Sequence, residues 1–204
     1  MVVIGAGIAG LAAAQALRQK KIPTVVLEAS SRVGGRVFTD TSLGIPLDLG
    51  ASWLHGTTDN PIAQLAIASN ITSQATDYRR ITRYGPDGQV VEMDDSWLNS
   101  LLARAMSWGE RQSIDRSLRD GLNHALGNLR LSTEGRKNLE YLINVQIEHE
   151  YAADVEQLSL WHWNSGRVLE GADVIFPLGF SQITQKLAEG LDIRLHQTVG
   201  QIRQ

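Results

Sequence analysis

The sequence predicts an α/β protein that begins with a β-α-β unit and carries a mainly helical insertion. Three observations support this fold class. Within the first 28 residues, an apolar run, a glycine-rich turn, an alanine-rich stretch and a second apolar run follow one another. Helical spacing then dominates the middle of the chain, and short apolar runs return after Gly166. The 204 residues, 43% of them hydrophobic, suffice for one soluble domain and part of a second.

The first elements follow from local patterns. The patterns predict buried strands at residues 2–4 and 24–27 and a helix between them at residues 8–18. The two strands should therefore be parallel with a right-handed crossover. Residues 43–49 are a weaker strand candidate. Asn60 is an N-cap residue before a first-turn proline, which predicts a helix from Pro61 to about Ala68.

The pattern changes after residue 76. Apolar runs at 81–84 and 89–91 flank Pro86-Asp87-Gly88, which predicts a hairpin. Three amphipathic helices are expected between residues 97 and 147, the last of them capped by Ser132 or Thr133. A helix at 182–187 and a strand at 193–195 end the chain. We therefore expect segments 1–76 and 166–204 to form one domain and 77–165 to belong to a second.

Composition excludes several classes of function. The net charge of -3 provides no basic surface for nucleic acid. The absence of cysteine excludes disulfides and thiolate metal sites, and the histidines do not stand at metal-ligand spacing, so no metal site is expected. No apolar run approaches the roughly 20 residues of a membrane span. A disulfide-free chain suits the cytoplasm, which is the expected location.

The turn Gly5-Ala6-Gly7-Ile8-Ala9-Gly10 follows a strand and opens a helix, the context in which this spacing binds a dinucleotide. Gly5 permits the tight turn, Gly7 lets the backbone approach a pyrophosphate, and Gly10 allows close helix packing. The helix N-terminus offers free N–H groups to anionic oxygen. Glu28 ends the second strand, where an acid accepts hydrogen bonds from the ribose and repels the 2′-phosphate of NADP.

FAD rather than NAD is indicated by the segment Arg32-Val33-Gly34-Gly35-Arg36, directly after the Glu28 strand. Adjacent glycines let the backbone fold over the dinucleotide. The planar guanidinium of Arg36 can direct several N–H donors towards the phosphates of the dinucleotide. The alternative for Arg36 is a solvent-exposed loop charge.

The blocks VVIGAGIAGLAAAQAL, VVLEASSRVGGRV and DLGASWLHG resemble the flavin-containing amine oxidase superfamily, which includes polyamine oxidases, monoamine oxidases and flavin histone demethylases. The first two blocks are shared with carotenoid desaturases and protoporphyrinogen oxidase, whereas the third is similar to the polyamine oxidase segment beside the isoalloxazine ring. YAADVEQLSL and LAEGLDIRLHQTV extend the resemblance nearly end to end. It implies a Rossmann-like FAD-binding β-α-β domain with an inserted, mainly helical part of a substrate-binding domain.

The glycine turn and this resemblance together give the residues expected to contact FAD. They are Gly5, Gly7, Ile8, Ala9, Gly10, Glu28, Ala29, Gly35, Arg36, Gly50, Ala51, Ser52, Trp53 and Val199.

The resemblance implies FAD-dependent oxidation of a polyamine-like amine to an imine, with hydride transfer to flavin and reoxidation by O2 to give H2O2. His55 is the expected catalytic residue, because its motif position faces the substrate in polyamine oxidases and a neutral imidazole can accept a hydrogen bond from an amine. The alternative for His55 is a packed histidine with structural hydrogen bonds. Ala153 stands where plant polyamine oxidases have a glutamate, with Asp154 next to it, which weakens polyamine as the substrate.

Relatives of this type place a lysine near flavin N5, and the second half of the FAD site, beyond the region that this chain resembles. We therefore expect the C-terminal half of the fold to be absent, the chain alone to be inactive, and its own missing half to be a partner. The chain would be a fragment, a truncated gene product or one half of a split enzyme.

Two other functions remain open. One is another FAD oxidase or desaturase of the superfamily, acting on an amino acid or an isoprenoid. The other is a non-catalytic module such as the Rab GDP-dissociation inhibitors, against which Gly34, Gly35 and Arg36 argue.

Overall fold

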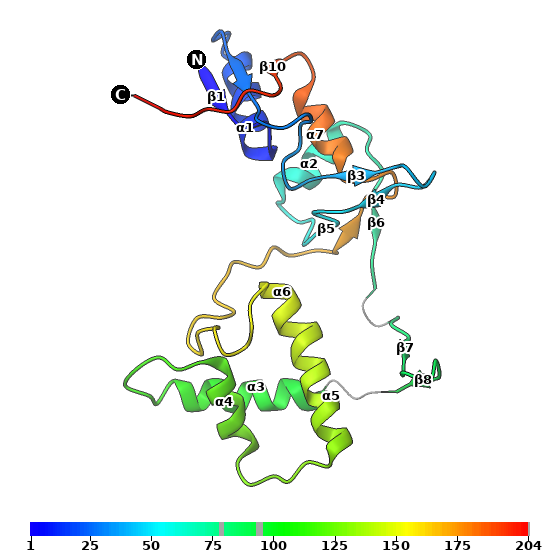
Figure 1. Ribbon diagram of the computed structural model, residues 1–204, viewed down its shortest axis with the longest axis vertical. Helices are drawn as coiled ribbons and strands as arrows, with labels where there is room; N and C mark the ends of the chain where they lie inside the picture. Colours follow the sequence, from blue (N-terminus) through cyan, green and yellow to red (C-terminus); the bar gives the residue numbers. More distant parts are fainter. Residues whose placement is uncertain (78–79, 93–95, 204) are drawn as a thin grey trace. The chain divides into compact units, whose positions relative to one another are not determined.

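The computed structural model describes residues 1–77, 80–92 and 96–203 (Figure 1). It consists of two compact units, one formed by Met1–Arg79 with Val168–Gln204 and the other by Arg80–Arg167. The chain thus leaves the first unit and later returns to it. The expected division after residues 76 and 165 lies close to these bounds.

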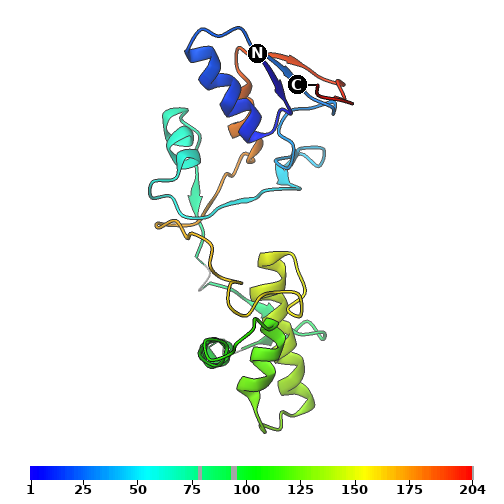
Figure 2. The same ribbon diagram turned by 90° about the vertical axis from the view of Figure 1, so that its left-hand side faces the viewer.

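A parallel sheet and two helices form one part of the first unit (Figures 1 and 2). The strands lie in the order β1-β2-β10, and α1 connects β1 to β2 and contacts α7. The elements are β1 (Val2–Ile4), α1 (Ile8–Gln19), β2 (Val25–Leu27), α7 (Ser181–Ala188) and β10 (Asp192–Arg194). Leu11, Ala14 and Val26 are fully buried in the core that these elements share. The predicted α/β class and β-α-β unit are confirmed.

Short antiparallel strands and the helix α2 form the rest of this unit. In one sheet β9 lies between β5 and β6, while β3 pairs with β4. The elements are β3 (Thr39–Asp40), β4 (Leu47–Asp48), β5 (Trp53–Leu54), α2 (Pro61–Ala68), β6 (Gln74–Ala75) and β9 (Val174–Ile175). The Asn60 side chain accepts a hydrogen bond from the Ile62 N–H, which caps α2 as predicted. Leu54, Val174, Phe176 and Ile183 are buried together in a second core of this unit.

The strand expected over residues 43–49 is wrong for most of its length. Only its last part forms β4, because the preceding residues make a turn. The Asp40 carboxylate accepts hydrogen bonds from the Ser42 N–H and hydroxyl, and Gly44 has a φ of +79°. Both features favour a turn over an extended strand.

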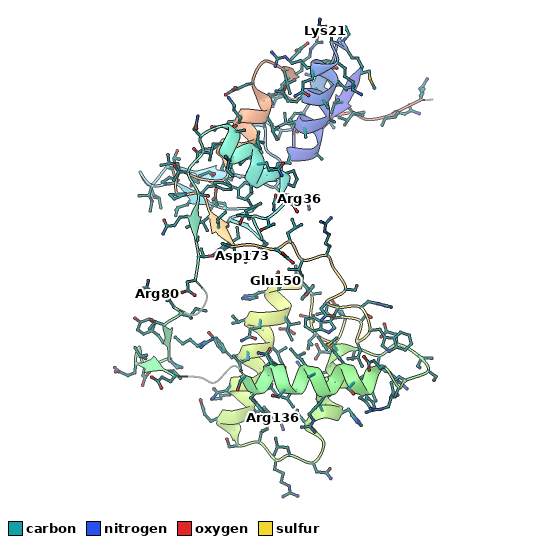
Figure 3. The ribbon with its side chains drawn as sticks, turned by 180° about the vertical axis from the view of Figure 1, so that it is seen from behind. Lys21, Arg36, Arg80, Arg136, Glu150 and Asp173 are labelled. Carbon is teal, nitrogen blue, oxygen red and sulfur yellow. The ribbon has the colours of Figure 1, made fainter. Side chains whose placement is uncertain are left out.

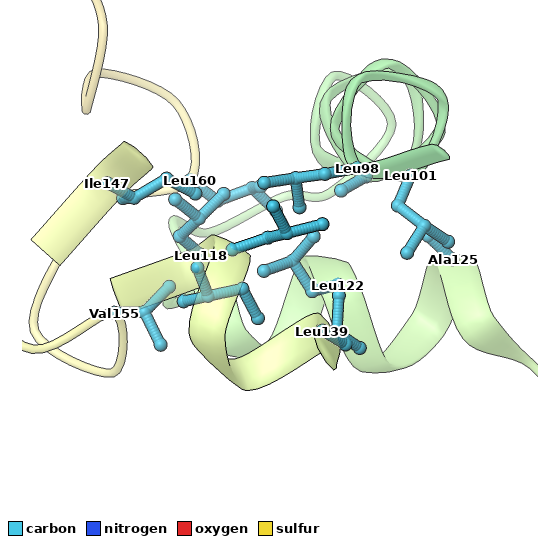
Figure 4. Close-up of a cluster of buried hydrophobic side chains, with 12 residues drawn as sticks. Leu98, Leu101, Leu118, Leu122, Ala125, Leu139, Ile147, Val155 and Leu160 are labelled. Atoms are coloured by element: carbon cyan, nitrogen blue, oxygen red, sulfur yellow. The ribbon is translucent and has the colours of Figure 1, made fainter. Parts of the chain in front are cut away.

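The second unit is a hairpin followed by helices, as predicted. Its elements are β7 (Arg83–Tyr84), β8 (Val90–Val91), α3 (Ser96–Gly109), α4 (Leu118–Leu126), α5 (Thr133–Ile143), the π-helix η1 (Asn144–Glu148) and α6 (His149–Tyr151). Ser132, rather than Thr133, caps α5 by accepting a hydrogen bond from the Gly135 N–H. Leucine side chains from three helices meet in the core of this unit (Figure 4). Within the described residues, no helix is long and apolar enough to cross a membrane.

Candidate functional site

A cavity of about 1130 Å³ opens in the first unit where the turn after β1 meets two later loops. The residues that line it come from three sequence segments that the patterns had marked. They are Ile4, Gly5, Gly7, Ile8, Ala9, Gly10, Arg32, Gly34, Gly35, Arg36, Val37, Phe38, Leu49, Gly50 and Ala51. Nine of the residues expected to contact the cofactor are therefore brought together.

The first wall is the glycine turn that leads into α1. Gly5 has a φ of +92°, and a Cβ added to Gly10 would lie 2.0 Å from the backbone oxygen of Gly5. The fold itself thus requires glycine at both positions. Among the described residues, no side chain caps the N-terminus of α1, and its first turn contains no acid. The N–H groups there remain available to an external anion.

Gly7 is different, because nothing in the fold requires a glycine there. Any residue can adopt its φ of -77°, and a Cβ added to it would have no other heavy atom within 4 Å. That Cβ would instead enter space beside the start of α1. A glycine here therefore leaves room for a ligand that approaches the backbone, which fits the pyrophosphate of a dinucleotide.

Two glycine substitutions separate folding from binding. We expect Gly10→Ala to lower the free energy of unfolding by an amount near the upper end of about 1–3 kcal/mol, because the added Cβ would meet the Gly5 backbone oxygen. Gly7→Ala should change the free energy of unfolding by less than about 1 kcal/mol yet weaken flavin binding about tenfold. Denaturant unfolding and flavin titration of both variants measure this. Unimpaired flavin binding by folded Gly7→Ala would contradict the assignment of this space to the cofactor.

Glu28 directly follows β2, and its carboxylate accepts hydrogen bonds from the backbone of two loops. It accepts hydrogen bonds from the Ala6 N–H at 2.7 Å and the Ser30 N–H at 2.8 Å. These bonds, that from Ala6 first, hold the pKa of the Glu28 carboxyl below its ordinary value. The side chain is therefore ionised at neutral pH, and both oxygens keep lone pairs for the hydroxyls of a ribose.

Glu28, Ala29 and Val199 do not line the cavity. Ala29 is exposed next to Glu28, and Val199 is half-buried beyond β10. The segment before Val199 runs beside Glu28, because the N–H of Gln197 donates to the Glu28 carbonyl and that of His196 to the Ser30 carbonyl. Val199 thus follows a segment that is tied to the expected ribose position.

The second wall is the loop after β2, which Arg32 holds in shape. Its guanidinium donates to the carbonyls of Val33, Val37 and Gly35 and lies 4.4 Å from the centre of the Phe38 ring. Sequence reasoning assigned no role to Arg32, although its place in the Arg-x-Gly-Gly-Arg pattern was a usable signal.

The two glycine-rich loops of the cavity lie side by side. Gly34 is buried, and its N–H donates to the Ala6 carbonyl at 2.8 Å. Arg36 is exposed at the cavity wall (Figure 3). Its charge is therefore accessible to a ligand in the cavity.

The third wall is the beginning of the Gly50 to Gly56 segment. The Ala51 N–H donates to the Arg36 carbonyl at 3.2 Å, and a Cβ on Gly50 would lie 2.0 Å from the same oxygen. Gly50 and Ala51 line the cavity, but Ser52 and Trp53 do not. The Ser52 hydroxyl donates to the Gly50 carbonyl, and Trp53 lies in β5 with 46% of its surface exposed.

His55 follows β5 and is not packed in the core, since 59% of its side chain is exposed. Its Nδ1 lies 2.9 Å from Oδ2 of Asp173. Sequence reasoning missed Asp173, because 118 positions separate the two residues. The described part of the chain holds no cluster of three or more potential metal ligands.

Comparisons with known proteins agree on one family. A family model described as flavin containing amine oxidoreductase matches residues 8–204. Polyamine oxidase 4 of Oryza sativa subsp. japonica is 33% identical over 221 residues, which cover 99% of this chain and 45% of the rice protein. Lysine-specific histone demethylase 2 of Homo sapiens is 29% identical over 215 residues, which cover 98% of this chain and 26% of the human protein.

A solved structure supports the same fold. A double mutant of putrescine oxidase, made for structure-based redesign of cofactor binding, matches with a TM-score of 0.60 and 21% sequence identity. The match covers 96% of this chain and 50% of the putrescine oxidase chain. The present chain thus spans about half the length of the polyamine oxidases it matches.

Proposed function

The chain belongs to the family of flavin-containing amine oxidoreductases, and from this premise we propose that its first unit binds FAD and that the whole protein oxidises an amine. The observation that carries the proposal is the open space at Gly7 beside the uncapped N-terminus of α1. A phosphate placed there would meet free N–H groups and no side chain.

The proposal specifies FAD rather than another flavin because of Glu28 and Arg36. An ionised carboxylate at the end of β2 suits the ribose of an adenosine, which FMN does not contain. The exposed guanidinium of Arg36 adds charge-assisted donors at the cavity wall for the phosphates.

A bound flavin would supply the electron acceptor for a hydride equivalent from the carbon next to the amine nitrogen, and O2 would be the oxidant that returns it to the oxidised form with release of H2O2. The residues of this chain bind and orient the amine. An alkylammonium must first lose a proton, because only the neutral amine has a nitrogen lone pair. That lone pair stabilises the positive charge that develops on the carbon as the hydride leaves. His55, exposed at the end of β5, is the proposed acceptor of this proton.

The proposed substrate is a polyamine-like amine, supported by the match of the plant polyamine oxidases over nearly the whole chain. The match covers less than half of those proteins, so the activity proposed is that of the whole protein that contains this chain. We propose that a further polypeptide segment supplies the rest of the flavin site.

Anaerobic mixing of the flavin-loaded protein with amines tests the proposal. Spermine, N-acetylspermine and a simple monoamine should bleach the flavin absorption at different rates, which ranks the substrate classes. The proposal fails if none of the three reduces the flavin while dithionite does.

A further inference from the structure

We propose that Asp173 is a positioning residue that fixes the proton of His55 on Nδ1 and so leaves Nε2 free to accept a proton from the amine. This inference rests on the proposed role of His55. It starts from the 2.9 Å contact between His55 Nδ1 and Asp173 Oδ2.

The Asp173 carboxylate holds both the ring of His55 and the backbone after it. Oδ1 accepts a hydrogen bond from the Gly56 N–H at 2.8 Å, while Oδ2 faces the imidazole. Gly56 has a φ of +66°, and an added Cβ would lie 2.2 Å from the Leu169 backbone oxygen. The turn that carries His55 is therefore closely defined by its neighbours.

Asp173 is itself held in place by the sheet that it precedes (Figure 3). Its carbonyl accepts hydrogen bonds from the N–H and the hydroxyl of Thr76. The next two residues form β9, which pairs on one side with β5, directly before His55, and on the other with β6, directly before Thr76. His55 and Asp173 thus flank two strands that pair with each other, which suits a fixed geometry.

The chemistry of the contact determines which nitrogen of the ring carries hydrogen. An ionised carboxylate only accepts hydrogen bonds, so Nδ1 must be the donor in this pair. In a neutral imidazole the other nitrogen then has the free lone pair. Nε2 of His55 is therefore the proton acceptor, and it faces away from the carboxylate.

The same contact favours the product of proton transfer. When an ammonium group passes its proton to Nε2, the ring becomes an imidazolium with a carboxylate at Nδ1. An opposite charge at this distance stabilises the charged ring. Because 59% of the His55 side chain and 25% of the Asp173 side chain are exposed, water screens most of this effect, and orientation of the ring is the main role.

The Asp173→Asn variant separates this role from a structural one. The amide oxygen can still accept from the Gly56 N–H, so the turn retains that bond. The amide NH2 then faces His55 as a donor, which requires a bare Nδ1 and moves the ring proton to Nε2. Asp59→Asn is the matched control, because it removes an exposed charge four positions after His55, at a left-handed position that asparagine tolerates.

Nitrogen-15 NMR of histidine-labelled protein determines the tautomer of His55 directly, and this measurement does not depend on amine oxidation. We expect the Nδ1–H form of neutral His55 in the wild type and in Asp59→Asn, and the Nε2–H form in Asp173→Asn. The His55→Gln spectrum identifies the signal among the five histidines. An Nδ1 without a proton in the wild type, or the same tautomer in Asp173→Asn as in the wild type, would overturn the proposal.

Anaerobic flavin reduction tests the consequence for catalysis. Asp173→Asn should slow reduction by a good amine about ten- to a hundredfold, whereas the His55→Ala/Asp173→Asn double variant should be no slower than His55→Ala. Losses that multiply in the double variant would show that Asp173 acts independently of His55 and overturn the proposal. If no amine reduces the wild-type flavin, the proposed function fails, while the tautomer measurement still decides the role of Asp173.

Discussion

Replacing His55 by alanine should lower the rate of flavin reduction by the preferred amine about ten- to a thousandfold, the range expected for a group that positions or deprotonates the substrate. The flavin absorption spectrum should stay nearly unchanged. His55 does not line the cavity assigned to the dinucleotide, and more than half of its side chain is exposed. Its removal therefore takes away the proposed proton acceptor without leaving a cavity in the core.

Anaerobic stopped-flow reduction measures this effect, with His149→Ala as the control. His149 is an exposed histidine of α6, so its loss should leave the rate within about a factor of two of the wild type. A His55→Ala protein that is reduced as fast as the wild type would remove His55 from catalysis. Loss of the flavin itself would mean that His55 supports the cofactor instead.

Replacing Glu28 by alanine should weaken FAD binding by about 1.5–3 kcal/mol, or about ten- to 150-fold, the loss expected for charge-assisted hydrogen bonds to a ribose. The structure adds a second contribution of the same sign. The Ala6 and Ser30 N–H groups lose their acceptor, which loosens the turn that should hold the pyrophosphate. Glu28→Gln should fall between the wild type and alanine, since its amide keeps one acceptor oxygen.

Equilibrium titration of the apoprotein with FAD measures these affinities. Glu189→Ala is the matched control, because it removes an equal charge from an exposed pair with Lys186 in the same unit. That control should bind FAD as the wild type does. Wild-type affinity in Glu28→Ala would refute the ribose assignment.

The features that the sequence predicted well are those encoded locally. The strand, glycine turn and helix at the N-terminus depend only on neighbouring residues. Gly5 adopts a positive φ, and Gly10 packs against the Gly5 backbone, five positions earlier. The caps at Asn60 and Ser132 are likewise satisfied two or three residues further on. Gly35 and Arg36, which the pattern after Glu28 marked as cofactor contacts, line the cavity, and their contact with FAD stays a prediction.

Features that join distant segments were not predicted. The strands β5, β9 and β6 have two residues each, too few for periodicity to show, and they pair across about a hundred positions. The contact of Asp173 with His55 depends on this pairing, so no local pattern could reveal it. Arg32 holds its loop through backbone carbonyls, which any sequence offers, so the Arg-x-Gly-Gly-Arg pattern could mark the residue but not these contacts.

Whether the cavity beside Gly7 binds FAD is tested most directly by the identity of the nucleotide that the protein containing this chain carries. The protein should purify yellow, and mass spectrometry of the compound released on denaturation should identify FAD in about equal molar amount. A colourless protein that takes up no added FAD would contradict the account.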